Sequence, residues 1–203
     1  MKNAGLAIIL FVMSISAHAQ FFLPTGGRIA FSKVKQEQGK PELLQAKKIQ
    51  VVLAFDSMVV GEYSDKSALK GRLSPTYWAS HSADKFKESF ITKFNQLGKS
   101  TKTSAQIDSS GADYRLVIYT TFLSTGYSEG ISKEPAKIDA VCIFYDKAGK
   151  QVVLEALDHV PGQTFGAGDM DIISRVTQCY QKLGKDLYNR IAKQFEFGSP
   201  AED

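Results

Sequence analysis

The sequence contains few of the residues from which metal centres and thiol chemistry are built. Its 203 residues include two cysteines, three histidines and a single tryptophan. The cysteines form no C-x-x-C pair, and the histidines form no H-E-x-x-H motif. Many zinc sites and dithiol redox sites are identified by these spacings. These absences argue against both classes, and we predict neither a metal nor a cofactor.

A strong excess of one charge is also absent. The 25 basic and 21 acidic residues leave a formal net charge of +4, and 43% of the residues are hydrophobic, as in globular proteins. The two densest basic spots, at Lys47-Lys48 and at 99–102, have no aromatic residues between the charges. We therefore interpret them as solvated surface and predict no nucleic-acid binding.

The only long hydrophobic run lies at the N-terminus. It extends from Ala4 to Ile15, follows Lys2, and precedes Ala17-His18-Ala19, an A-x-A cleavage pattern. This order is typical of a secretory signal peptide, and the run is too short for a permanent membrane span. We predict removal of residues 1–19, a mature chain that begins at Gln20, and a periplasmic or secreted location. No cysteine stands near the cleavage point, so no membrane anchor is predicted.

The remaining chain is predicted to form one α+β domain over residues 20–197, followed by a frayed tail at 198–203. A nearly all-apolar, β-branched stretch at 49–55 predicts a strand buried on both faces. Short connections indicate an antiparallel meander of three further strands, at 114–122, 138–145 and 151–157.

Two helices are predicted from the spacing of apolar side chains. The first begins at a Ser82 or Asp84 cap, ends at Gly98, and places on one face Phe86, Phe90, Phe94 and Leu97. The second covers about 169–195, with Arg175 facing water and an apolar stripe of Ile172, Val176, Cys179 or Tyr180, Leu183, Leu187, Ile191 and Phe195.

The order β-α-β-β-β-α predicts an α+β fold with a mixed, mostly antiparallel sheet and two main helices packed on it. Segments 64–82 and 99–111 are predicted to be an ordered loop and a polar linker. The cysteines, Cys142 and Cys179, fall on a predicted strand and on the last helix. Both are expected to be buried, either as a disulfide, which an oxidising compartment permits, or as two free thiols.

Residues 126–130 match the G-x-S-x-G pattern that surrounds the nucleophilic serine of α/β-hydrolases, here Ser128. That chemistry requires a helix after the serine, whereas a further strand is predicted here. Asp158 and His159 are adjacent, so a regular strand would point them to opposite faces, and Asp139 has no fixed relation to His159. We predict a hairpin loop and keep a Ser128 hydrolase as an alternative.

Two other segments have a structural and a functional interpretation. The glycine-rich loop at 162–171 precedes a helix, but Asp169 and Asp171 would occupy the place of a bound phosphate, so we predict that they cap the helix. Tyr77 and Trp78 have side chains that could stack on a ligand such as a sugar. Aromatic residues in a long loop more often attach that loop to the core.

Several segments together resemble a largely uncharacterised set of small secreted proteins from Bacteroidetes-type bacteria. These segments are F-D-S-M-V-V-G at 55–61, A-D-Y-R-L at 112–116, P-A-K-I-D at 135–139, P-G-Q-T-F-G at 161–166 and Y-Q-K-L-G-K at 180–185. The resemblance implies an extracytoplasmic α+β domain, similar in fold to the amino-terminal domain of TolB and related envelope lipoproteins. It implies no reaction.

We therefore predict a non-enzymatic binding or assembly module of the cell envelope, with an envelope protein as partner. The alternatives are a hydrolase that uses Ser128 and a small-ligand or glycan binder that uses Tyr77 and Trp78.

Overall fold

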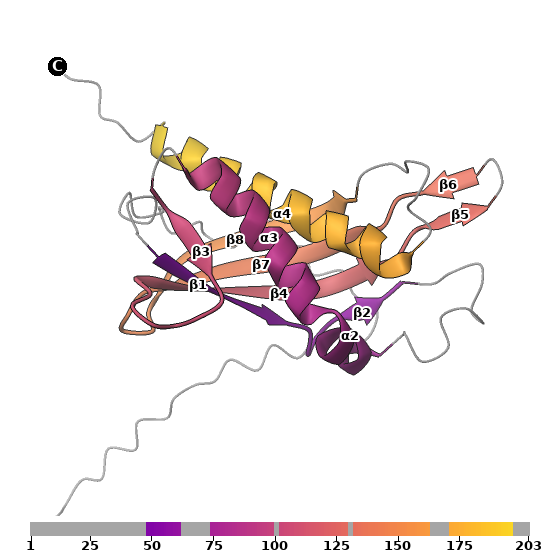
Figure 1. Cartoon of the computed structure of the whole chain (residues 1–203), viewed down its shortest axis with the longest axis horizontal. Coiled ribbons are helices and arrows are strands. Elements are labelled where there is room, and N and C mark those ends of the chain that lie inside the picture. The colour runs from indigo at the N-terminus through magenta and orange to yellow at the C-terminus, as the bar shows by residue number, and fades with distance from the viewer. Residues whose placement is uncertain (1–47, 62–73, 100–101, 130–131, 163–170, 197–203) are drawn as a thin grey trace, which may run out of the picture. The chain divides into compact units, whose positions relative to one another are not determined.

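The computed structural model describes residues 48–61, 74–99, 102–129, 132–162 and 171–196 (Figure 1). The predicted signal peptide, residues 20–47 and the predicted tail lie outside these ranges. The helices are α2 (Pro75–His81), α3 (Ala83–Gly98) and α4 (Ile172–Glu196). The strands are β1 (Lys48–Ala54), β2 (Val59–Val60), β3 (Ser104–Gln106), β4 (Tyr114–Ser124), β5 (Tyr127–Glu129), β6 (Ser132–Glu134), β7 (Lys137–Tyr145) and β8 (Gln151–Pro161).

The main sheet is mixed, as predicted, and has the order β3-β1-β4-β7-β8, with β2 also paired to β4. The three long strands β4, β7 and β8 form the predicted antiparallel meander. In contrast, β1 pairs in parallel with both β3 and β4, and β2 pairs in parallel with β4. The parallel pairs follow from the connection through α2 and α3, which returns the chain to the starting edge of the sheet.

The short elements β2, α2 and β3 occur where the sequence analysis predicted no helix or strand. Residues 75–81 form α2 rather than a loop: Pro75 stands in the first turn, and the Ser74 hydroxyl accepts a hydrogen bond from the Thr76 amide at 3.2 Å. Seven residues are too few to show a helical period, although Ser-Pro is a recognised start signal. The predicted linker at 99–111 contains β3, a three-residue edge strand that is too short and polar to be recognised from its composition.

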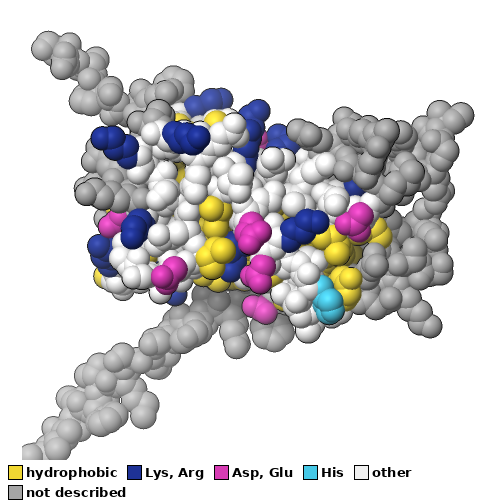
Figure 2. All heavy atoms as spheres, in the orientation of Figure 1, with side chains coloured by type: hydrophobic (Ala, Val, Ile, Leu, Met, Phe, Trp, Pro, Cys, Tyr) yellow, Lys and Arg dark blue, Asp and Glu magenta, His cyan; other side chains and the backbone are white. Residues whose placement is uncertain are grey.

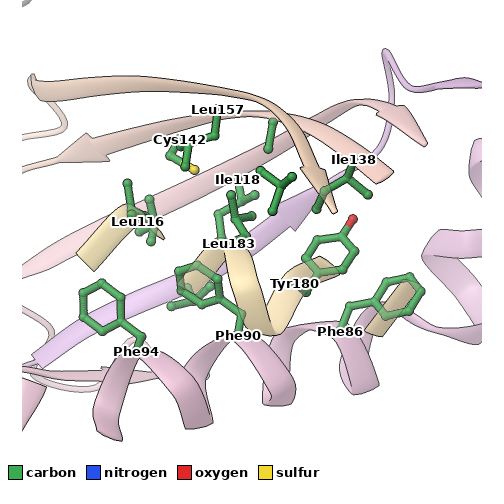
Figure 3. Packing of buried hydrophobic residues seen from close by; sticks show 14 of the residues in the cluster. Phe86, Phe90, Phe94, Leu116, Ile118, Ile138, Cys142, Leu157, Tyr180 and Leu183 are labelled. Carbon is green, nitrogen blue, oxygen red and sulfur yellow. The ribbon is translucent and has the colours of Figure 1, made fainter. Parts of the chain in front are cut away.

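The core lies between the helices and one face of the sheet (Figure 3). Phe86, Phe90 and Phe94 of α3 are buried, as predicted, and meet the sheet and α4. The buried side chains of α4 are Val176, Cys179, Tyr180, Leu183, Leu187, Tyr188 and Ile191. The Phe86 and Tyr180 rings stack with their centroids 4.7 Å apart. Arg175 was predicted to face water but is 8% exposed.

The prediction that the first strand is buried on both faces is wrong. Ile49 and Val51 are each 1% exposed, whereas Gln50 and Val52, which point to the opposite face, are only half-buried. In the described ranges, the side chains that enter the core from β4 and β7 also alternate, as Leu116 and Ile118 do on β4. The described helices therefore cover one face of the sheet and leave the other uncovered.

Candidate functional site: the uncovered face of the sheet

The face of the sheet opposite the helices is unusually apolar. Strand alternation and the pairing registers place on it Val52 and Ala54 of β1, Val59 of β2, Arg115, Val117, Tyr119 and Phe122 of β4, Asp139, Val141, Ile143 and Tyr145 of β7, and Leu154 and Ala156 of β8. We call this set the open face. One-sided sheets normally alternate apolar residues on the core face with polar residues on the solvent face. The central positions of this second face are apolar or aromatic, whereas its margins carry polar residues, among them Gln50, Arg115, Lys137 and Asp139.

The open face has a small apolar centre of its own. Val117 and Val141 are 8% and 7% exposed, yet neither belongs to the core beneath the helices. At the end of the face near β2, Val59 is 60% exposed, the most exposed large apolar side chain in the described ranges. Apolar side chains gathered on one face are more informative than single exposed residues, because large apolar patches often mark contact sites.

Arg115 and Tyr145 stand at one end of the open face, and the Tyr119 hydroxyl interacts with the Tyr145 hydroxyl. The Arg115 guanidinium lies 5.2 Å from the centroid of the Tyr145 ring, a cation–π contact. Burial raises the pKa of the Tyr145 hydroxyl, the neighbouring Tyr119 hydroxyl adds to this rise, and the charge of Arg115 opposes it. The end of the face formed by Arg115 and Tyr145 is therefore positively charged and aromatic.

The opposite end of the open face carries an acid beside a histidine. The β7–β8 register shifts here, so Asp139 faces both Asp158 and His159, and His159 adopts a left-handed φ of 54°. The Asp139 carboxylate accepts a hydrogen bond from the His159 amide at 2.6 Å and lies 3.9 Å from the imidazole. The sequence analysis expected no fixed relation between these residues and opposite orientations for 158 and 159. The bulge therefore brings Asp139 next to His159, a relation that the sequence alone did not define.

One side chain from a helix contacts the backbone at each edge of the main sheet. At the β3 edge, the Asn95 amide donates to the Ala105 carbonyl at 3.1 Å and accepts from the Ala105 amide at 2.7 Å. At the β8 edge, Arg190 donates to the Ala156 carbonyl at 2.9 Å and lies 3.6 Å from the buried Glu155 carboxylate. These contacts occupy backbone groups that an added strand would need.

Cys142 and Cys179 are both buried and are free thiols in the structure. Burial raises the pKa of Cys142 far above its ordinary value, with a further contribution from the Glu155 charge. Burial also raises the pKa of Cys179 to about 12. Thiols held in this way are protonated and pack as small apolar side chains, so neither has the character of a nucleophile.

Ser128 lies in β5, which pairs with β6 in a two-stranded hairpin, Ser128 opposite Lys133. The turn into β5 uses Gly126, at φ 62°, where an added Cβ would lie 2.2 Å from the Glu134 carbonyl oxygen. The hairpin replaces the strand–turn–helix that a hydrolase nucleophile requires. Gly126 therefore allows a close backbone approach that a side chain would prevent.

Trp78 is fully buried and packs against Phe86, with ring centroids 6.1 Å apart. Tyr77 is half-buried and stacks on the His81 ring, with centroids 4.4 Å apart. The two aromatic residues therefore do not form a shared exposed platform, and Trp78 attaches α2 to the core. The His81 Nδ1 atom is within hydrogen-bond distance of the Tyr77 carbonyl and the Ser80 hydroxyl, all within α2.

The start of α4 is capped by Asp171. Its carboxylate accepts hydrogen bonds from the Ser174 amide and hydroxyl, both at 3.1 Å. Burial alone would raise the pKa of this carboxyl, but the hydrogen bonds from Ser174 outweigh it and lower the pKa. Asp169, the other predicted cap, lies outside the described residues.

The helix-bearing side has a different character from the open face. Figure 2 views the side on which α3 crosses in front of the strands in Figure 1, and basic and acidic side chains are interspersed over it. Within the described ranges, no helix is both long and apolar enough to cross a membrane, and no group of three or more metal-binding side chains is found.

No family model and no curated protein matches this sequence. Among solved structures, the chain is similar to a DUF330 protein of Xanthomonas campestris, with 14% identity, coverage of 76% of this chain and 87% of that one, and a TM-score of 0.41. It is also similar to the PelC dodecamer of Paraburkholderia phytofirmans, with 16% identity, 73% and 93% coverage, and a TM-score of 0.38. A third, lipoprotein GNA1162 of Neisseria meningitidis, has 16% identity, 72% and 98% coverage, and a TM-score of 0.26. At these values the likenesses carry no functional argument, and the proposals below rest on this chain's own residues.

Proposed function

We propose that this protein is an exported, non-enzymatic binding or assembly module of the cell envelope, and that the open face is its contact surface. The observation that carries the proposal is the apolar second face, on which valine, isoleucine, leucine and tyrosine replace the polar residues of an ordinary solvent face. The signal-like N-terminus supports export.

The arrangement of the sheet favours contact through this face over other modes. Asn95 and Arg190 occupy backbone groups at the two edges, which works against binding by strand addition. The apolar centre at Val117 and Val141 is flanked by aromatic and charged side chains at both ends. An apolar centre within a more polar border is the usual composition of a protein–protein interface.

The two alternative functions are less well supported. A hydrolase that uses Ser128 lacks the helix that should follow the nucleophile, because β6 follows β5. A glycan binder that uses Tyr77 and Trp78 would have to act without the buried Trp78 ring. We therefore do not extend either alternative.

Site-specific photo-crosslinking tests the proposal. A photoreactive amino acid at Ile143, in the middle of the open face, should capture a protein in the envelope of expressing cells. The same amino acid at Ile107, which is 50% exposed and lies outside the open face, is the matched control and should capture little. Equal capture at both positions, or none at Ile143, would show that the open face is not the contact surface. Labelling of Ser128 by a fluorophosphonate probe would instead favour the hydrolase.

A further inference from the structure

We propose that the occupant of the open face is a second copy of this chain, bound face to face about a two-fold axis that reverses the strand direction. The inference rests on the proposed function, and specifies its partner. It is carried by the β4–β7 register and by the placement of charge on the open face.

The β4–β7 register makes the open face self-complementary. Arg115 pairs with Tyr145 at one end of the ladder, and Phe122 pairs with Asp139 six steps away. The midpoint of this span is the Ile118–Cys142 pair, whose side chains point into the core. On the open face, Val117 and Ile143 lie one ladder step to one side of this pair, and Tyr119 and Val141 lie one step to the other side. A two-fold axis that passes over the pair places the first two residues of one copy opposite the last two of the other. Val117 and Ile143 of one copy then face the Tyr119 ring and Val141 of the other, so the centre of the contact is mainly apolar and aromatic.

The same operation brings opposite charges together. It places the Asp139 end of one copy against the Arg115 end of the other. The Arg115 guanidinium lies over the Tyr145 ring, 5.2 Å from its centroid. Arg115 is therefore close to β7, the strand that also carries Asp139. Both ends of a two-fold dimer would thus contain an Arg115–Asp139 contact, whereas stacking with the strands running the same way would place like charges opposite each other.

The size of the face predicts a reversible dimer. Four strands about 4.8 Å apart and six ladder steps of about 3.3 Å give a footprint of about 400 Å² in plan. A standard stable interface buries about 800 Å² of accessible surface on each partner. We therefore expect an equilibrium between monomer and dimer at micromolar concentrations.

Analytical ultracentrifugation of the purified exported protein over a range of micromolar concentrations tests the inference. The wild type should form a dimer, and Ile143→Asp should shift it to monomer because a charge would be buried in the apolar centre. Ile107→Asp introduces the same charge at an exposed site outside the open face and should leave the dimer intact. Circular dichroism verifies the fold, and Leu154→Asp on β8 replaces Ile143→Asp if that variant is unfolded.

A charge variant tests the proposed orientation. Arg115→Glu should raise the dimer dissociation constant by about tenfold or more, and Arg115→Gln by less, because only the former places two acids together. A wild-type chain that stays monomeric throughout, or a dimer that Ile143→Asp leaves intact, would overturn the inference. Capture of a different protein at Ile143 together with a monomeric wild type would overturn the second copy while leaving the proposed function in place.

Discussion

At the scale of single residues, the core is specified by a few buried polar groups with defined partners. The Thr120 hydroxyl and the Tyr180 hydroxyl are 2.6 Å apart, and both residues are fully buried. This hydrogen bond connects the middle of β4 to α4, and the Tyr180 ring also stacks on Phe86 of α3. A buried polar group that loses its partner costs more than the bond itself contributes, so this pair fixes how α4 sits on the sheet.

The first prediction concerns that hydrogen bond. Tyr180→Phe should lower the free energy of unfolding by about 1–2 kcal/mol, because the Thr120 hydroxyl remains buried without its partner. The double variant Thr120→Val with Tyr180→Phe should lose less than the sum of the two single losses. Urea denaturation of the four proteins measures the coupling, and strictly additive losses would contradict it.

The second prediction concerns the thiols. Because burial raises the pKa of Cys142 and Cys179, the latter to about 12, neither should react with a thiol reagent in the native protein near neutral pH. In guanidinium chloride without reductant, both thiols should react. A protein that shows no thiols under those conditions carries the disulfide, and rapid reaction in the native state would disprove their burial.

The third prediction concerns the cap of α4. Asp171→Ala should lower the free energy of unfolding at neutral pH by about 0.5–2 kcal/mol. Since the pKa of Asp171 is lowered in the folded state, its contribution is present above the unfolded carboxyl pKa and is lost as pH falls through the lower, folded value. The wild-type advantage in thermal unfolding should therefore vanish in strong acid. Asp171→Asn keeps an acceptor, and an equally large loss in that variant would argue against the cap.

At the scale of elements, the two long helices approach each other closely at one point. An added Cβ on Gly184 of α4 would lie 2.7 Å from the Phe90 carbonyl oxygen of α3, a distance that real contacts do not reach. The glycine therefore sets the spacing of α3 and α4. Along the same helices, Phe90 and Phe94 fill the space between that contact and the sheet.

The fourth prediction follows from this contact. Gly184→Ala should lower the free energy of unfolding by about 1–3 kcal/mol through overpacking, although alanine favours an isolated helix by about 1 kcal/mol. The exposed neighbour Lys185→Ala, on the same helix, should change it by less than about 0.5 kcal/mol. Chemical denaturation compares the two, and a stabilised Gly184→Ala protein would contradict the packing argument.

At the scale of the whole molecule, the two faces of the sheet differ in what packs against them. One face forms the core with α2, α3 and α4, while the other places apolar side chains between Arg115 at one end and Asp139 at the other. The hydrogen bonds from Asn95 and Arg190 to backbone groups at the two sheet edges limit pairing with additional strands.

The fifth prediction concerns where that domain works. The mature protein should begin at Gln20 and be recovered in the periplasmic fraction, and Ala19→Arg should block cleavage because signal peptidase requires a small residue there. Intact mass and N-terminal sequencing measure both outcomes. A chain that retains Met1, or that stays with membranes after a salt wash, would show that residues 1–19 are not a cleaved signal.

Local patterns in the sequence determined much of the fold. The four-residue spacing of Phe86, Phe90 and Phe94 predicts a helix with one buried face, and the structure has that helix at Ala83–Gly98. The β-branched runs and short turns predicted the meander of β4, β7 and β8. These signals are local, because a period of 3.6 or 2 and a turn residue can be recognised within one segment. Short elements such as α2 and β3 lacked such a period and were missed.

Only the tertiary structure decided which side chains share a surface. Examples are the parallel pairing of β1 with β4, the bulge that brings Asp139 to His159, and the shared face of Val117 and Val141. Such pairings depend on strand register and on which face the helices cover. The alternation within one strand shows two faces but not which of them is buried. For this reason the apolar strand at 49–55 suggested burial on both faces, whereas the described helices cover only one of them.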